Sequence, residues 1–147
     1  MTRTAMLALA VLGGCKGILN NDGDDSGSDS GGTPVDEFSP RITEPDAFCY
    51  EHTEGDTFFQ WIITASVTDP QGDDTLDVWA TLEVLAGGGV VYDIDAVVDK
   101  TAGTINTSFN ADTAGINCDA ADTYTFRLTA RDSEGNEGTA EVAGRRQ

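Results

Sequence analysis

Apolar and polar residues alternate along much of residues 57–131, and this alternation constrains the fold more than any other feature of the sequence. Successive side chains of a strand point to opposite faces of a sheet, so a period of two indicates strands with one buried face. Four runs keep their apolar residues on one parity: Phe59, Trp61, Ile63, Ala65 and Val67; Leu76, Val78, Ala80, Leu82 and Val84; Tyr92, Ile94, Ala96 and Val98; Tyr124, Phe126, Leu128 and Ala130. The sequence therefore predicts an all-β domain.

Turn sequences separate these runs. Asp-Pro-Gln-Gly at 69–72, three glycines at 87–89 and Asp-Ser-Glu-Gly-Asn at 132–136 supply the backbone freedom and local acceptors that turns need. We expect about seven strands, near residues 40–44, 57–68, 75–85, 90–98, 103–109, 122–131 and 138–143, with an irregular connection over 111–121. Short strands at this spacing, without a convincing amphipathic helix, favour an antiparallel β-sandwich.

Two segments resemble bacterial Ig-like repeats. Residues 123–140 combine an alternating strand, an Asp-x-x-Gly-Asn turn and a small-residue strand, which resembles the last hairpin of PKD-type repeats. Glu54-Gly55-Asp56, followed by a strand into Thr-Asp-Pro-Gln-Gly-Asp at 68–73, resembles the second strand and following loop of cadherin-like repeats. The resemblance covers roughly residues 40–143 and implies an Ig-like β-sandwich domain over residues 37–147.

The N-terminus has the pattern of an export signal. Arg3 precedes an apolar stretch at 5–12, which is too short to cross a bilayer of about 30 Å as a helix. The sequence Leu-Gly-Gly-Cys at 12–15 resembles the bacterial lipobox. That resemblance implies cleavage after residue 14 and lipid on Cys15, which would anchor the chain to a membrane. The alternative is an ordinary secretory leader in which the cysteine occurs by chance.

Residue 16 and the segment after it suggest how the domain is displayed. Lys16 stands where enteric lipoproteins retained at the inner membrane carry Asp, so the family rule implies the outer membrane. Residues 15–36 then form a Gly-, Ser- and Asp-rich stretch that we interpret as a flexible tether. The formal net charge of −18 argues against nucleic acid and anionic lipid headgroups as partners, because binding them needs clustered basic residues.

The three cysteines fit one lipid anchor and one pair. Cys49 and Cys118 precede the second and sixth expected strands, whose beginnings lie at the same end of an Ig-like sandwich. Export favours oxidation, so we expect a disulfide, with two buried thiols as the alternative. Metal binding by these cysteines is disfavoured because His52, the one histidine, has no further soft ligand at a zinc-like spacing.

Two loops could supply calcium ligands. The loop after the second strand and the loop before the last strand lie at one end of an Ig-like sandwich. Oxygen ligands converging from both would suit calcium; the alternative is two solvated turns. The candidate ligands are Asp69, Asp73, Asp74, Asp132, Glu134 and Asn136.

Trp79 is out of phase with the apolar face of its strand, between Val78 and Ala80. An exposed Trp could stack on a sugar or anchor a protein partner, whereas the alternative is partial burial under a neighbouring strand or the Gly-rich loop.

Taken together, these patterns predict a lipid-anchored protein of the bacterial cell envelope that displays one Ig-like module for structural or adhesive contact with protein or glycan. Calcium binding by the acidic loops is the alternative function. We expect no enzymatic activity, because a lone histidine without a Gly-x-Ser-x-Gly elbow offers no base for a nucleophile.

Overall fold

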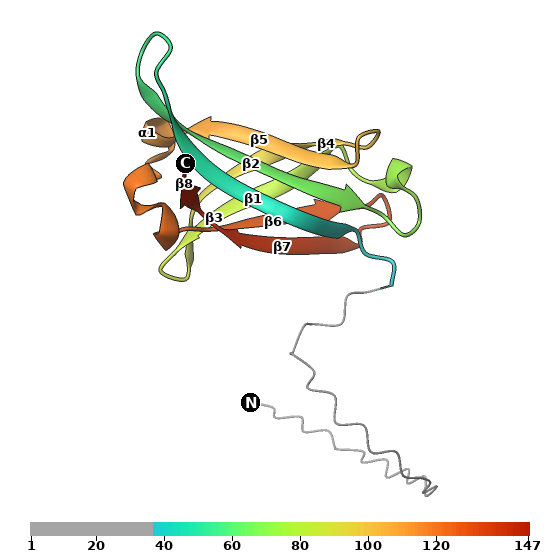
Figure 1. Cartoon of the computed structure of the whole chain (residues 1–147). Coiled ribbons are helices and arrows are strands. Elements are labelled where there is room, and N and C mark those ends of the chain that lie inside the picture. Colours follow the sequence, from blue (N-terminus) through green and yellow to red (C-terminus); the bar gives the residue numbers. More distant parts are fainter. Residues whose placement is uncertain (1–36) are drawn as a thin grey trace, which may run out of the picture. The chain divides into compact units, whose positions relative to one another are not determined.

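The computed structural model describes residues 37–147, the range expected for the folded domain (Figure 1). The leader, the tether and Cys15 lie outside the described residues. The expected all-β class is confirmed. The strands are β1 (Arg41–His52), β2 (Phe58–Thr68), β3 (Trp79–Ala86), β4 (Gly89–Asp99), β5 (Thr104–Asn110), β6 (Thr125–Arg131), β7 (Glu137–Ala143) and β8 (Arg145–Arg146). Short helical segments are η1 (Asp73–Thr75), α1 (Ala111–Ala114) and η2 (Cys118–Thr123).

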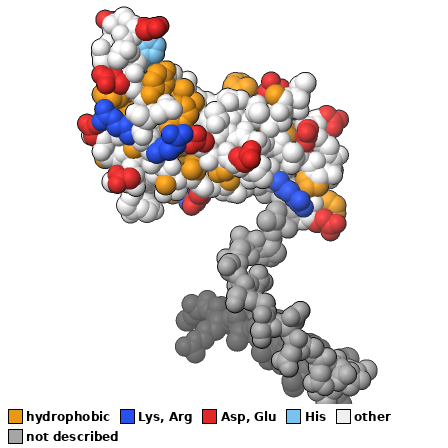
Figure 2. Space-filling view, in the orientation of Figure 1, with side chains coloured by type: hydrophobic (Ala, Val, Ile, Leu, Met, Phe, Trp, Pro, Cys, Tyr) orange, Lys and Arg blue, Asp and Glu red, His pale blue; other side chains and the backbone are white. Residues whose placement is uncertain are grey.

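The strands form one sheet in the order β7-β6-β3-β4-β5-β2-β1-β8, which curls until its ends nearly meet as a barrel. At the closing seam the backbone of β7 lies against the start of β1, so that a Cβ added to Gly138 would overlap the carbonyl oxygen of Pro40, the residue before β1. β8 then pairs with β1, with Arg145 opposite Phe48. Acidic side chains are spread over the face shown in Figure 2, in keeping with the net charge of −18.

The expectation of a wholly antiparallel sheet is wrong at one pair. β8 is parallel to β1, whereas every other strand pair among residues 37–147 is antiparallel. β8 follows β7 after Gly144 and keeps its direction, which is also the direction of β1. A segment of two arginines carries no periodicity, so the sequence did not indicate this eighth strand.

The first strand is longer than expected, running to His52 instead of ending near residue 44. Glu44 has a φ of 51°, and the pairing with β2 shifts between Thr43 and Asp46. Such a bulge accommodates Pro45 at the sheet edge, after which the strand resumes. The third strand begins at Trp79 and not near residue 75, since residues 73–75 form η1 and Leu76 makes only an isolated bridge with Asp132.

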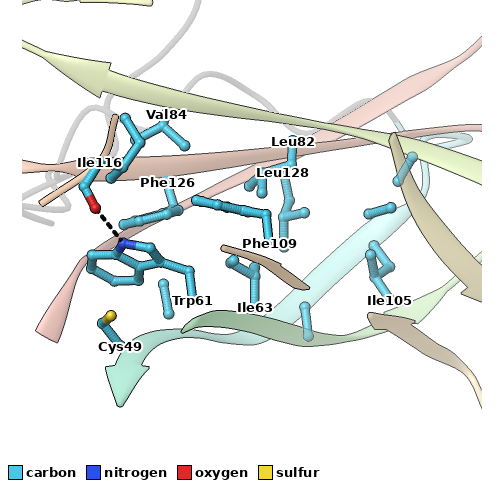
Figure 3. Close-up of a cluster of buried hydrophobic side chains, with 14 of the residues drawn as sticks. Cys49, Trp61, Ile63, Leu82, Val84, Ile105, Phe109, Ile116, Phe126 and Leu128 are labelled. Atoms are coloured by element: carbon cyan, nitrogen blue, oxygen red, sulfur yellow. Dashed lines mark hydrogen bonds between the residues drawn. The ribbon is translucent and has the colours of Figure 1, made fainter. Parts of the chain in front are cut away.

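The core lies inside the curled sheet and is centred on Trp61, as the alternation predicted (Figure 3). The Trp61 ring is fully buried against Phe126, with 4.6 Å between ring centroids. Its Nε1 donates a hydrogen bond of 3.0 Å to the carbonyl oxygen of Ile116. A buried indole N–H needs such a partner, so this bond ties the connection after α1 to β2.

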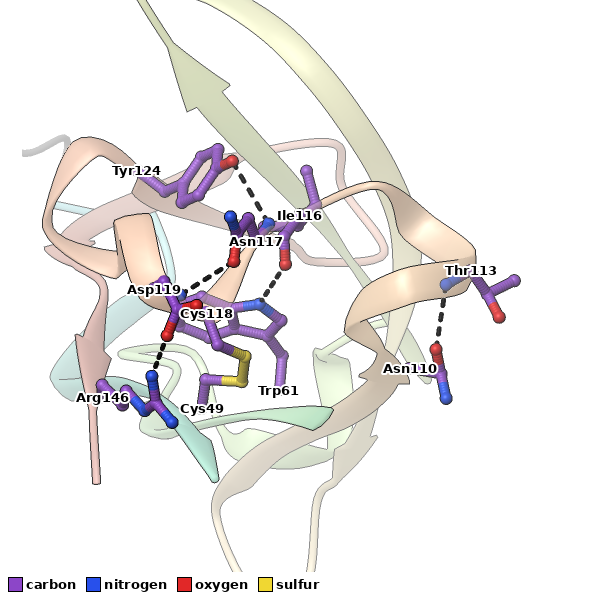
Figure 4. Close-up of a disulfide and its surroundings, with 10 residues drawn as sticks. All are labelled: Cys49, Trp61, Asn110, Thr113, Ile116, Asn117, Cys118, Asp119, Tyr124 and Arg146. Carbon is purple, nitrogen blue, oxygen red and sulfur yellow. Dashed lines mark hydrogen bonds and ion pairs between the residues drawn. A yellow bond between two sulfur atoms is a disulfide. The ribbon is translucent and has the colours of Figure 1, made fainter. Parts of the chain in front are cut away.

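The Cys49–Cys118 disulfide is present, with 5.7 Å between the two Cα atoms (Figure 4). Cys49 lies within β1, opposite Trp61, and not in a connection before β2 as expected. This correction follows from the extension of β1 past Pro45. Cys118 is the first residue of η2, so the disulfide joins β1 to the segment that precedes β6.

The disulfide should stabilise the fold by about 2–5 kcal/mol, because it closes a loop of 69 residues in the unfolded chain. We expect the double variant Cys49→Ala with Cys118→Ala to lose that much unfolding free energy in urea titrations of the purified protein. The reduced wild type is the matched control and should unfold at a similar urea concentration. Recovery of both cysteines as free thiols in non-reducing peptide maps would contradict the pairing.

Candidate functional site

Trp79 lies on the outer face of the sheet at the start of β3. Its side chain is 57% exposed, which excludes burial under a neighbouring strand. Val97, its partner in the β3–β4 pairing, points to the same face and is 51% exposed. The two side chains therefore form a small exposed apolar patch on the outer face of β3 and β4.

A groove of about 210 Å³ lies beside this patch, on the outer face of β3, β6 and β7. Strand register explains its lining, because Thr81 pairs with Thr129 on β6, and Arg131 pairs with Glu137 on β7. These side chains alternate outward with Trp79. The full lining is Asp77, Trp79, Thr81, Thr129, Arg131 and Glu137.

The charged side of the groove is held by an ion pair between Arg131 and Glu137. The hydrogen bond with Glu137, together with the charges of Glu137 and Asp77, raises the pKa of Arg131 above its ordinary value, so the guanidinium stays cationic. The groove thus combines an aromatic face, one cation, carboxylates and hydroxyl groups. An aromatic face with convergent polar groups is an arrangement that can orient a polar ligand.

The two acidic loops lie side by side, at the end of the sheet away from α1 and β8 (Figure 1). Gln71 Nε2 donates to Glu134 Oε2 across them at 2.9 Å, and the backbone N–H of Ser133 donates to the carbonyl of Thr75 at 2.9 Å. Asp132 forms an isolated bridge with Leu76. The proximity expected of the loops is therefore present.

Within these loops, the carboxylates mostly accept hydrogen bonds from the backbone. Asp69 Oδ1 accepts from the N–H of Gln71 at 2.7 Å, and Asp73 Oδ1 accepts from the N–H of Asp69 at 2.8 Å. Asp74 contributes its backbone carbonyl, which accepts from Lys100 Nζ at 3.1 Å. Among residues 37–147, no three His, Cys, Asp or Glu side chains are placed together to hold a metal ion.

Asp132 and Asp69 are buried, which sequence reasoning missed. Asp132 Oδ1 accepts from the N–H groups of Glu134 and Asn136 at 2.9 and 2.8 Å, and its Oδ2 accepts from Asn136 Nδ2 at 2.7 Å. Asp69 Oδ2 is buried without a hydrogen-bond partner. The sequence signal that could have indicated these hydrogen bonds is the Asp at the start of each Gly-containing turn, because an Asp side chain there forms an Asx turn.

A row of rings follows the outer face of the β1–β2 hairpin, and the sequence analysis did not single it out. Phe48, Tyr50 and His52 have centroids 6.5 and 6.2 Å apart, and His52 stacks on Phe58 at 4.8 Å. The Arg145 guanidinium lies 5.0 Å from the Phe48 ring. Figure 2 shows hydrophobic side chains gathered beneath the projecting hairpin. The period of two in β1 was the signal that could have revealed the row.

Comparison with known proteins identifies no relative. No protein-family model matches the sequence, and searches of curated proteins and of solved structures found no match. No helix in the described part of the chain is long and apolar enough to cross a membrane.

Asp132 should make stability depend on acid pH. Burial raises the pKa of its carboxyl, but hydrogen bonds from the Asn136 side chain and from the amides of Asn136, Glu134 and Gly135 outweigh burial and hold the pKa below its ordinary value of 3.8. A carboxyl with a depressed folded-state pKa stabilises the fold above its unfolded-state pKa. That contribution is lost as pH falls through the folded-state value.

We therefore expect the Asp132→Asn variant to melt at a lower temperature at neutral pH, and to lose less stability than wild type below about pH 4. Thermal melts across this range would measure both effects. Asp112→Asn is the matched control, since Asp112 is exposed in the first turn of α1. Identical acid profiles for wild type and Asp132→Asn would contradict this role of Asp132.

Proposed function

We propose that this chain is a lipid-anchored cell-envelope protein whose Ig-like domain makes adhesive contact with a glycan through the groove beside Trp79. The lipobox-like sequence that ends at Cys15 supports the anchor, and Lys16 supports the outer membrane. The Cys49–Cys118 disulfide supports an oxidising, extracytoplasmic location. Contact, and not catalysis, is the role proposed for the domain.

The strand order supports an Ig-like arrangement. In Ig-like domains one sheet contains the first, second, fifth and fourth strands, and the other contains the third, sixth and seventh. Here β7-β6-β3 and β4-β5-β2-β1 follow the same grouping. β4 pairs with β3 along most of its length and with β5 near its end, which links the two groups into one curled sheet.

The exposure of Trp79 is the observation that carries the glycan proposal. A Trp side chain offers a large flat surface at a low cost in conformational entropy, because it has only two rotatable bonds. Protein interfaces are usually depleted of charged residues at their centres. In this groove the Arg131–Glu137 ion pair lies close to Trp79. A hydroxyl-rich sugar can form hydrogen bonds with these charged groups, so it suits the groove better than the surface of a partner protein does.

Binding to an array of bacterial envelope polysaccharides would test the proposal. We expect the Trp79→Ala variant to lose affinity about tenfold or more for any glycan that wild type binds, since loss of a stacked aromatic ring costs about 1–3 kcal/mol. Val90→Ala is the matched control, because Val90 is 49% exposed and does not line the groove. Retention of the same glycan by Trp79→Ala with wild-type affinity would overturn the proposal.

Calcium binding at the acidic loops is the second candidate function. The observation in its favour is Asp69 Oδ2, a buried carboxylate oxygen without a partner in a region crowded with negative charge. A bound cation would satisfy this oxygen and stabilise the fold by mass action, by about 2.7 kcal/mol at one hundred times the dissociation constant. The site would require other carboxylates to turn toward Asp69.

The test is the melting temperature with millimolar calcium against chelator, at constant ionic strength. We expect a calcium-specific rise that is absent from the Asp69→Asn variant, with magnesium as the control for general charge screening. Equal rises with both ions, or no rise, would show that the loops are turns without a calcium site.

A further inference from the structure

β4 is hydrogen-bonded on both sides over only part of its length. It pairs with β3 from Gly89 to Val97, but it pairs with β5 only over Val97–Asp99. β5 pairs with β2 over its whole length, Thr104–Asn110, but its pairing with β4 ends at Asn106. Along Gly89–Ala96, which we call the β4 edge, no strand among residues 37–147 pairs with the side that faces away from β3.

The orientation of the free backbone groups follows from one hydrogen bond. Thr107 Oγ1 donates to the carbonyl oxygen of Asp95 at 3.2 Å, so this carbonyl faces the β5 side. In an antiparallel pair the backbone groups of alternate residues point the same way. The N–H and C=O of Asp93 therefore also point away from β3, where β5 no longer lies alongside.

The two faces of the β4 edge differ in chemistry. Asp93 and Asp95 are exposed on the outer face, opposite Glu83 and Thr81 of β3. Tyr92 and Ile94 are half-buried and pack against the core. The Tyr92 ring lies 4.8 Å from that of Phe109 on β5, so aromatic side chains line the gap where the strands diverge.

We propose that the β4 edge binds an extended segment of a partner protein, whose side chains alternate between apolar and basic, by adding it to the sheet as a strand. The unpaired groups of Asp93 would bond to the backbone of the segment. Its apolar side chains would pack beside Tyr92 and Ile94, and its Lys or Arg side chains would lie next to Asp93 and Asp95, since opposite charges on adjacent strands attract.

The composition of the β4 edge is consistent with pairing. Gly89–Ala96 contains no Lys or Pro and includes exposed Val90 and Val91. Its edge protection consists of Asp93, Asp95 and the bulge at the pairing of Val84 and Leu85, and acidic side chains repel an acidic strand but attract a basic one. A second copy of this chain is a poorer occupant, because it would bring its own Asp93 and Asp95 to the same edge on a molecule of net charge −18. The β4 edge adjoins the groove beside Trp79, since Asp95 lies opposite Thr81, but its residues do not line the groove and the proposal does not depend on glycan binding there.

The first test uses a short blocked peptide of alternating Lys and Val residues, with an alternating Glu and Val peptide as the charge control. Amide hydrogen exchange followed by NMR on the whole mature protein would report strand addition directly. We expect the Asp93 amide to exchange at least about tenfold more slowly when the Lys peptide is bound, because the amide gains a hydrogen bond. Binding without slower exchange at Asp93, or equal binding of the Glu peptide, would overturn the proposal.

Two variants separate backbone pairing from charge. Asp93→Pro removes an N–H that faces away from β3, so it should preserve the β3–β4 pairing and the melting transition but weaken peptide binding at least about tenfold. Asp93→Asn with Asp95→Asn keeps both N–H groups and should weaken binding about three- to tenfold. Asp112→Asn is the control at an exposed carboxylate on α1. Wild-type affinity in both edge variants, or peptide-independent dimerisation through the β4 edge, would contradict the proposed partner.

Discussion

The structure depends on the covalent and hydrogen-bonded junction around Cys49. The disulfide joins β1 to η2, and Trp61, opposite Cys49 on β2, holds the preceding connection by its bond to Ile116. The C-terminus meets the same place, because the N–H of Gln147 donates to the carbonyl of Cys49 at 2.9 Å. Figure 4 shows the disulfide beside the Trp61 indole and its bond to Ile116. This junction therefore holds two parts of the chain in place. One is the connection between β5 and β6, and the other is β8, which pairs with β1.

Close backbone packing at this junction explains why small residues are required there. A Cβ on Gly144 would lie 2.6 Å from the carbonyl oxygen of Ala121 and within 2.9 Å of the Phe126 and Trp61 rings. Gly144 is also where β7 gives way to β8. The chain can therefore pass over the core and pair with β1 only because no side chain is present. At the opposite end, Asp132 shapes the turn that directs β7 back along β6.

The period of two was enough to predict the all-β class and the buried Trp61, because a pleated strand forces alternate residues to opposite faces. It placed Trp79 out of phase with the apolar face but left open whether the indole is exposed or partly buried, and the structure shows it exposed. It could not predict β8, where two arginines carry no pattern, nor the continuation of β1 past Pro45, where a bulge absorbs the proline. The disulfide partners were predicted although the position of Cys49 within a strand was not. The turn sequences indicate the local hydrogen bonds of Asp69 and Asp132, but the burial of these side chains also depends on the packing of the two loops against each other, which local sequence cannot reveal.

The surfaces proposed for binding are those that the fold leaves unsatisfied, namely the exposed indole of Trp79 and the unpaired side of β4. The glycan proposal presupposes export, which the lipobox-like sequence before Cys15 and the Cys49–Cys118 disulfide support. The intact mass of the protein extracted from envelopes tests this directly. The account predicts a chain that lacks residues 1–14, carries acyl mass on Cys15 and has lost two hydrogens to the Cys49–Cys118 bridge. A mass that retains the leader, or that shows an unmodified Cys15 with free thiols, would contradict it.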